Sequence, residues 1–177
     1  DRPVLEGLGG TVLVSILWAL GLKGAAIAVV MGGASPETVY YGTLIQAACA
    51  LHGVPTAIGV SVAYEESRFK PGVVSSKGAR GLMQVIPGHN RVWCSPLTRH
   101  FKLNVGNLLV NVYEGCWRLA DFRRQKGKNY LCHYASGWTC KPKGERYQRR
   151  VEARARRAMR QIERRSPWAM YRVSWKP

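Results

Sequence analysis

Two short segments of the chain carry side chains that could cleave a sugar bond. The first is Glu65-Glu66-Ser67-Arg68-Phe69, and the second, Gly81-Leu82-Met83-Gln84, begins fifteen residues after Glu66. The first segment sets a carboxyl group at the end of an apolar helical stretch, and the second is a glycine-containing turn that can bring a neutral amide back towards it. A glycosidic oxygen leaves readily only when an acid protonates it, and uncharged hydrogen-bonding groups suit the binding of sugars. The two segments therefore indicate a site for glycan cleavage.

A general acid must keep its proton near neutral pH, which requires a carboxyl group with a raised pKa. Burial raises the pKa of a carboxyl group, because a dry environment disfavours the charged form. We therefore expect apolar neighbours to raise the pKa of Glu66. The candidates nearby in the sequence are Val60, Val62, Ala63 and Leu82.

Most glycosidases also need a second carboxylate at a defined distance from the first. Between Tyr40 and Cys140 the chain offers few acidic residues besides Glu66: they are Glu65, Glu114 and Asp121. Neighbours on a helix point about 100° apart, so Glu65 cannot easily share a cleft with Glu66. Glu114 and Asp121 lie on a different segment and stay open as second carboxylates.

Glu66-Ser67 and Gly81-Leu82-Met83-Gln84 resemble two motifs of the soluble lytic transglycosylase family, and the second motif is matched without change. The resemblance covers about residues 39–152. It implies a lysozyme-like α-helical domain that cleaves peptidoglycan at the β-1,4 bond between N-acetylmuramic acid and N-acetylglucosamine, with no metal and no organic cofactor. Glu66 would act first as the acid and then as the base.

The remaining family motifs are matched in part. Asn111 and Gly115 resemble an Asn that is followed four residues later by Gly, although Asn107 competes for the role. The segment 133–137 matches the family pattern at Tyr134 and at its final glycine, but it has Ala where the family has Asn. The resemblance implies that Tyr134 helps to position Glu66. It also implies that the remaining site residues bind the substrate: Ser67, Ser75, Met83, Gln84 and Asn111.

Cleavage of peptidoglycan by Glu66 could have either of two outcomes. In the transglycosylase scheme, the N-acetyl group of the substrate stabilises the developing positive charge, and Glu66 then takes a proton from the 6-hydroxyl of the same sugar, giving a 1,6-anhydro end. The scarcity of carboxylates fits this scheme. The alternative is a muramidase-type hydrolase that uses a second carboxylate to position water and leaves reducing ends.

The elements that must position these residues are helices. The spacing of apolar residues and the positions of helix-breaking residues predict helices over about 36–52, 56–66, 105–124, 130–135 and 145–165. In the first of these helices we expect five residues to face the core: Tyr41, Leu44, Ile45, Ala48 and Leu51. Residues 89–103 are irregular, and no strand is convincing. We therefore predict a mostly α fold: an apolar segment over 1–36, a lysozyme-like domain over 37–165 that ends in a basic amphipathic helix, and an aromatic tail over 166–177.

The apolar stretch from Leu8 to Ala34 contains one charged residue, Lys23. Its length would allow one membrane-spanning helix. Lys23 would be costly near the centre of such a helix, which favours a snorkelling or partnered lysine or two short helices instead. A secretory signal and an apolar helix packed in a larger assembly are the other interpretations of residues 8–34. A signal that is cleaved off would not remain in the mature chain, which favours a retained segment.

The formal net charge of +17 predicts an anionic partner, and the C-terminal end from Lys141 onward holds thirteen Lys and Arg against three Glu. Peptidoglycan is the expected substrate, and binding to nucleic acid is expected to be at most nonspecific. The ends of the chain would suit a phage virion component that opens the wall for genome ejection, or a conjugation or secretion apparatus. Either setting places the protein in the cell envelope or periplasm, delivered from a virion or anchored to the inner membrane.

The five cysteines include four within one span: Cys94, Cys116, Cys132 and Cys140. Two disulfides among these four would fit an oxidising compartment, and free buried thiols are the alternative. No Cys-x-x-Cys pair occurs, so a structural zinc site is not expected. Cys49 lies in an apolar run and is expected in the core.

Overall fold

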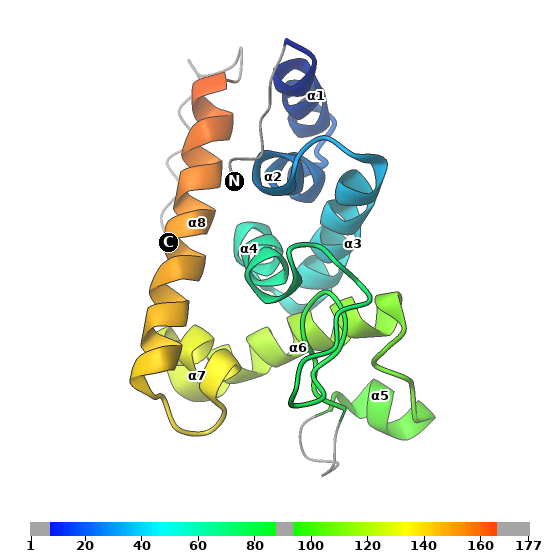
Figure 1. Ribbon diagram of the computed structural model, residues 1–177, viewed down its shortest axis with the longest axis vertical. Coiled ribbons are helices and arrows are strands. Elements are labelled where there is room, and N and C mark those ends of the chain that lie inside the picture. The colour runs from blue at the N-terminus through cyan, green and yellow to red at the C-terminus, as the bar shows by residue number, and fades with distance from the viewer. Residues whose placement is uncertain (1–7, 88–93, 166–177) are drawn as a thin grey trace.

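The computed structural model describes residues 8–87 and 94–165 (Figure 1). In chain order, its helices are α1 (Leu8–Ala19), α2 (Lys23–Gly32), α3 (Pro36–His52), α4 (Thr56–Ser67), α5 (Pro96–Phe101), α6 (Leu108–Lys126), the 3-10 helix η1 (Gly127–Asn129), α7 (Tyr130–Ser136) and α8 (Pro142–Arg165). Within the described ranges no strand forms, and Arg80 alone makes isolated bridges, to Val74 and Val85. The mostly α-helical prediction is confirmed. The predicted aromatic tail, 166–177, lies outside the described residues.

The layout centres on α4, which lies between α8 on one side and α3 on the other (Figure 1). The long α8 runs along one edge of the molecule, while α6 and α7 lie near its N-terminal end. Contacts of α4 with α2, α3 and α8 bury one residue after another from Ala57 to Ala63. The end of α4, where the candidate carboxyl group lies, is thus held by packing on several sides.

Helix α3 begins and ends where its sequence signals predict. The Ser35 hydroxyl accepts a hydrogen bond from the Thr38 amide at 3.1 Å, and Gly53 ends the helix in the left-handed conformation with φ +66°. The prediction that Leu51 faces the core is wrong, because its side chain is 75% exposed. Leu51 lies six residues after the fully buried Ile45, a rotation of about 240° around the helix, and this carries it off the buried face.

The apolar N-terminal stretch forms two short helices rather than one long one. Gly21 separates α1 from α2 with φ +74°, a conformation that glycine adopts without strain. Every residue of α2 from Gly24 to Met31 is buried, and the helix packs against α3, α4 and α8. Residues 1–36 were expected to form a separate segment, but α2 shares the core of residues 37–165. Among the described residues, no helix combines the length and the apolar character needed to cross a membrane.

Helices α2 and α3 approach closely because glycines face each other. A Cβ atom at Gly24 would lie 2.1 Å from the carbonyl oxygen of Gly42, and one at Gly42 would lie 2.4 Å from the carbonyl oxygen of Gly24. Gln46 of α3 adds hydrogen bonds: it accepts from the Gly24 amide at 2.6 Å and donates to the Gly21 carbonyl at 2.9 Å. The buried α2 thus obtains a partner for one of its otherwise unpaired N-terminal amides.

Helix α5 falls in a region that the sequence analysis treats as irregular. The Ser95 hydroxyl accepts from the Thr98 amide at 3.1 Å and caps the helix, and Pro96 takes its first position. The same Ser-Pro pair starts α3, so the sequence did contain a start signal for helix α5. The fully buried Glu114 of α6 binds the amide and hydroxyl of Ser95. A buried carboxylate therefore holds α5 against α6.

One disulfide is present, between Cys132 and Cys140, and it links α7 to the loop before α8. Cys94 and Cys116 are not bonded, so the expectation of two disulfides among the four cysteines is met for one pair. Cys49 is fully buried in the core, as expected.

Replacement of Gly42 by Ala is expected to destabilise the protein by about 1–3 kcal/mol or more, because the added methyl group must push α2 and α3 apart. Chemical unfolding monitored by circular dichroism measures this change. Gly72→Ala is the matched control, since a Cβ atom at Gly72 meets nothing within 4 Å. Equal stability of the two variants would contradict the close helix contact.

Candidate active site

Glu66 lies in the last turn of α4, next to the point where the chain leaves the helix. Its neighbour Ser67 is buried, and the Ser67 hydroxyl lies 2.9 Å from the carbonyl oxygen of Leu82 and 3.0 Å from that of Ala63. The hydroxyl thereby ties the end of α4 to the turn over residues 81–84. The structure gives Ser67 a contact that holds these two motifs together.

The turn over residues 81–84 is fixed by Asn111 of α6. The fully buried Asn111 side chain accepts from the Met83 amide at 2.9 Å and donates to the carbonyls of Arg80 and Val105, at 2.7 and 2.9 Å. Gly81 has φ +76°, and a Cβ atom there would lie 2.5 Å from the Asn111 side chain. Glycine is therefore needed for both the backbone conformation and the space. Asn111, and not Asn107, makes this contact, while Asn107 caps α6.

Met83 occupies the core side of the turn. Its side chain is fully buried, and a Cβ atom at Gly115 of α6 would lie 2.5 Å from its sulfur. The Met83 carbonyl accepts a hydrogen bond of 2.7 Å from the Tyr134 hydroxyl. Tyr134 therefore contacts the turn, and its hydroxyl is not the one that binds Glu66.

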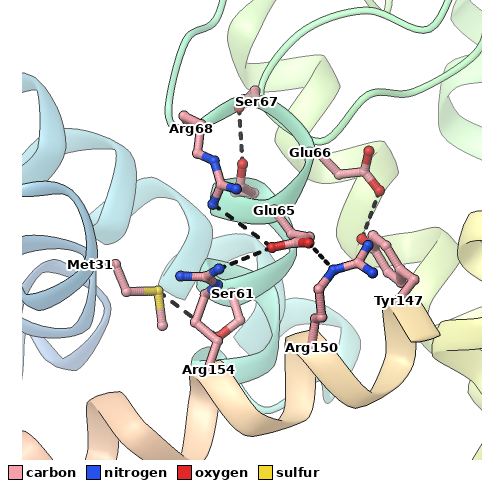
Figure 2. A network of polar contacts seen from close by, with 10 residues as sticks. Met31, Ser61, Glu65, Glu66, Ser67, Arg68, Tyr147, Arg150 and Arg154 are labelled. Atoms are coloured by element: carbon pink, nitrogen blue, oxygen red, sulfur yellow. Dashed lines mark hydrogen bonds and ion pairs between the residues drawn. The ribbon is translucent and has the colours of Figure 1, made fainter. Parts of the chain in front are cut away.

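The hydroxyl that binds Glu66 belongs to Tyr147 of α8, which donates to the carboxylate at 2.6 Å (Figure 2). Burial raises the pKa of Tyr147 well above its ordinary value, so this group remains a proton donor across the neutral range. Tyr147 lies on the basic amphipathic helix that the sequence predicts over about 145–165, but it is not among the predicted site residues. A hydroxyl on a face otherwise lined by apolar side chains is the signal that could have found it.

Burial raises the pKa of Glu66 from 4.5 to about 7. The hydrogen bond from Tyr147 lowers the pKa, the negative charge of Glu65 raises it, and the positive charge of Arg150 lowers it. Burial outweighs the other effects. Glu66 therefore holds its proton near neutral pH, as a general acid must. The four apolar residues named from the sequence are all fully buried: Val60, Val62, Ala63 and Leu82.

The other candidate carboxylates are bound elsewhere. Glu65 pairs with arginines of α8, Glu114 is buried against Ser95, and Asp121 accepts from Arg124 at 3.2 Å and from Gln125 at 2.7 Å. Among the described residues, Glu65 is the sole acidic group whose charge shifts the pKa of Glu66. The site in this part of the chain is thus built around one carboxyl group.

The remaining predicted site residues support the loop over residues 73–85. Ser75 accepts from the Ala79 amide at 3.0 Å. The Gln84 side chain donates to the carbonyls of Val73 and Gly81, both at 3.0 Å, and Gln84 itself has φ +47°. Within the described ranges, no group of three or more His, Cys, Asp or Glu residues could hold a metal ion.

The raised pKa of Glu66 predicts how stability depends on pH. The folded state binds this proton more tightly than the unfolded state, so stability falls as pH rises from about 4.5 to about 7 and stays lower above that. Glu66→Gln removes this loss of stability. At pH 8 its free energy of unfolding is expected to exceed that of the wild type by up to about 3 kcal/mol. At pH 4 the two proteins should be equally stable in urea unfolding. The exposed Glu145, replaced by Gln, is the control, and a pH-independent difference for Glu66→Gln would contradict the raised pKa.

An X-ray structure of an inactive mutant of the lytic transglycosylase Slt from Pseudomonas aeruginosa matches with a TM-score of 0.56 at 15% sequence identity, over 84% of this chain and 30% of that chain. This likeness confirms the lysozyme-like α-helical fold, and the chain spans about a third of the length of that protein. A search among curated proteins finds no match.

A family model described as the transglycosylase SLT domain matches residues 43–156. This range contains Glu66, the turn over 81–84, Asn111, Tyr134 and Tyr147, which the structure brings together. Because the match covers more than half of the sequence, the chain belongs to the transglycosylase SLT domain family.

Proposed function

We propose that this protein is a peptidoglycan lytic transglycosylase that cleaves the β-1,4 bond between N-acetylmuramic acid and N-acetylglucosamine. The observation that carries this proposal is the state of Glu66: a partly buried carboxyl group with a pKa of about 7 that accepts one hydrogen bond from Tyr147. Membership of the transglycosylase SLT domain family supports the substrate class. The net charge of +17 supports binding to an anionic wall polymer.

The reaction begins with Glu66 in its protonated form. Glu66 donates its proton to the glycosidic oxygen, and the bond from this oxygen to the anomeric carbon of N-acetylmuramic acid breaks. The substrate's own N-acetyl group stabilises the positive charge that develops at that carbon. The Glu66 carboxylate then removes the proton of the 6-hydroxyl, whose oxygen bonds to the anomeric carbon. The product is a 1,6-anhydro ring, and Glu66 has regained its proton.

Tyr147 assists both halves of this cycle. Its hydrogen bond is strongest when Glu66 is charged, so it stabilises the carboxylate that forms after the proton is donated. It also fixes the direction of the carboxyl group, because the Tyr147 ring is itself buried in the core. No second carboxylate is required in this scheme, which agrees with the binding of Glu114 and Asp121 elsewhere.

The setting we propose is the cell envelope, as part of a phage virion that opens the wall for genome ejection, with a conjugation or secretion apparatus as the alternative. Two surface features support contact with an anionic membrane or assembly. The side chains of Val12 and Ile16 on α1, and of Leu20 directly after it, recur every fourth residue and are 50–69% exposed. The outward face of α8 carries many arginines, and its C-terminal half lies near α1 (Figure 1).

Digestion of purified peptidoglycan tests the reaction. We expect soluble fragments that end in 1,6-anhydro-N-acetylmuramic acid, recognised by mass spectrometry as one water lighter than hydrolysis products. Glu66→Gln should lower the rate at least about 100-fold, because the amide cannot donate the proton. Fragments with reducing ends would instead identify a muramidase. Wild-type activity in the Glu66→Gln variant would contradict the assignment of Glu66.

A further inference from the structure

Glu65 makes a cluster of ion pairs that joins α4 to α8 (Figure 2). Its carboxylate accepts from Arg150 Nε at 2.5 Å and from a terminal nitrogen of Arg154 at 3.2 Å, while Arg68 of the α4 C-cap lies 3.8 Å away. The Glu65 side chain is only 8% exposed. The guanidinium groups of Arg154 and Arg68 each lie 4.5 Å from the centre of the Tyr64 ring. Glu65 is thus held almost dry between two helices.

The same face of α8 carries Tyr147. Tyr147, Arg150 and Arg154 are three and four residues apart, a spacing that aligns side chains along one face of a helix. Arg150 is only about 4.5 Å further along the helix axis than Tyr147. Ion pairs that fix Arg150 and Arg154 on Glu65 therefore also fix where the Tyr147 hydroxyl reaches α4.

The apolar contacts of α8 do not fix this position well by themselves. The buried face beyond Tyr147 carries Val151, Ala155, Ala158 and Ile162, and in its middle the only side chains are the methyl groups of the two alanines. Such a face tolerates rotation or a shift along the axis. A charged cluster does not, because any shift would leave the nearly buried Glu65 carboxylate without a partner, which is strongly unfavourable.

We propose that Glu65, Arg150 and Arg154 form a clamp that holds Tyr147 against Glu66 and thereby sets the activity of the site. The proposal deepens the proposed function and rests on it. Glu65, Arg150 and Arg154 are positioning residues in this account, since the group that touches the reacting carboxyl is Tyr147. The clamp gives the second glutamate of the Glu-Glu pair a role other than that of a second catalytic carboxylate.

Arg154 is the residue that separates positioning from direct electrostatics. The groups that face Glu66 are Glu65 on α4, Tyr147 and Arg150 on α8, and Tyr134 on α7. Arg150 acts on Glu66 partly through its own charge. The charge of Arg154 is directed at Glu65 and the Tyr64 ring. An effect of Arg154 on the chemistry of Glu66 is therefore indirect. It passes either through the position of α8 and Tyr147 or through the charge of Glu65, and a double-mutant cycle with Tyr147 separates these two routes.

The test is the pH profile of kcat/KM for peptidoglycan solubilisation by Arg154→Gln. We expect a loss of roughly 10- to 100-fold. The alkaline limb should also move to higher pH, because a weakened Tyr147 hydrogen bond no longer lowers the pKa of Glu66. Arg149→Gln is the matched control: it removes the same charge from the same helix, but Arg149 is exposed and pairs only distantly with Glu145, at 4.0 Å.

A double-mutant cycle with Tyr147→Phe completes the test. If Arg154 acts through Tyr147, the Arg154→Gln replacement should have little further effect in the Tyr147→Phe background. An equal effect in both backgrounds, or a profile like that of Arg149→Gln, would overturn the clamp. An inactive wild type would count against the proposed function instead, so the two failures are distinguishable.

A second observation concerns the sulfur atoms of Cys49 and Cys116. They lie 2.9 Å apart, join α3 to α6 across 67 residues of sequence, and belong to fully buried residues. Even carbon atoms that are not bonded settle about 3.5–4.0 Å apart, and sulfur is larger. The surroundings hold the pair in place: a Cβ atom at Gly59 would lie 2.2 Å from the Cys49 sulfur, and the Met83 sulfur lies 4.0 Å from that of Cys116.

We infer that Cys49 and Cys116 form a second disulfide when the protein matures in an oxidising compartment, to which the Cys132–Cys140 bond already points. The two thiols lose two protons and two electrons to the disulfide of a thiol–disulfide oxidoreductase, which becomes a dithiol. Burial raises the pKa of the Cys116 thiol, so the bond must form while the helices are still assembling. The bond would brace the core directly behind Met83.

Peptide mapping decides this point. Protein secreted into an oxidising compartment is unfolded without reductant, alkylated and digested. We expect the Cys49 and Cys116 peptides to be joined to each other and the Cys94 peptide to be alkylated. Protein treated with reductant before alkylation is the control and should show all cysteine peptides alkylated. Alkylation of Cys49 and Cys116 without reductant, or a bond from either to Cys94, would overturn the inference.

Discussion

The structure depends on keeping one carboxyl group partly dry at the end of a helix. Burial of Glu66 raises its pKa to about 7, although the Tyr147 hydroxyl and the Arg150 charge both lower this pKa. A charged carboxylate in such a place lowers the stability of the fold, so its surroundings must be held firmly by other contacts. The Ser67 hydroxyl joins the end of α4 to the turn over 81–84, and Asn111 joins that turn to α6. These two contacts position the end of α4 without touching the Glu66 carboxyl group itself.

The rigid frame behind the site explains why an apolar N-terminal stretch is present. Helix α2 is buried over its whole central part and contacts α3, α4 and α8, the helices that carry or support Glu66 and Tyr147. Its glycine-mediated approach to α3 brings the two backbones close together. An apolar segment that resembles a membrane span by composition is therefore used here to complete a core. Helix α1, with its exposed Val12 and Ile16, keeps an apolar face on the surface.

The parts that sequence could predict are those encoded locally. Ser35-Pro36 and Gly53 set the bounds of α3, and Glu66 and Gly81-Leu82-Met83-Gln84, chosen as a pair from the sequence, belong to segments that Ser67 joins in the structure. What sequence could not predict depends on distant partners. Tyr147 meets Glu66 across 81 residues, and the apolar face on which its hydroxyl lies does not tell which group that hydroxyl will bind. Similarly, the spacing on α3 did not reveal that Leu51 faces away from the core, because the buried face is chosen by α2, α4 and α6.

The most direct test of the account is the titration of the Glu66 carboxyl group itself. Carbon-13 NMR of protein labelled at the glutamate carboxyl carbons gives one titration curve per glutamate, and the signal missing from Glu66→Gln assigns the curve of interest. The account predicts a midpoint near pH 7 for Glu66, raised by burial from 4.5. A midpoint near 4.5 would show that this carboxyl group is charged at neutral pH, and it would contradict the role of Glu66 as the proton donor.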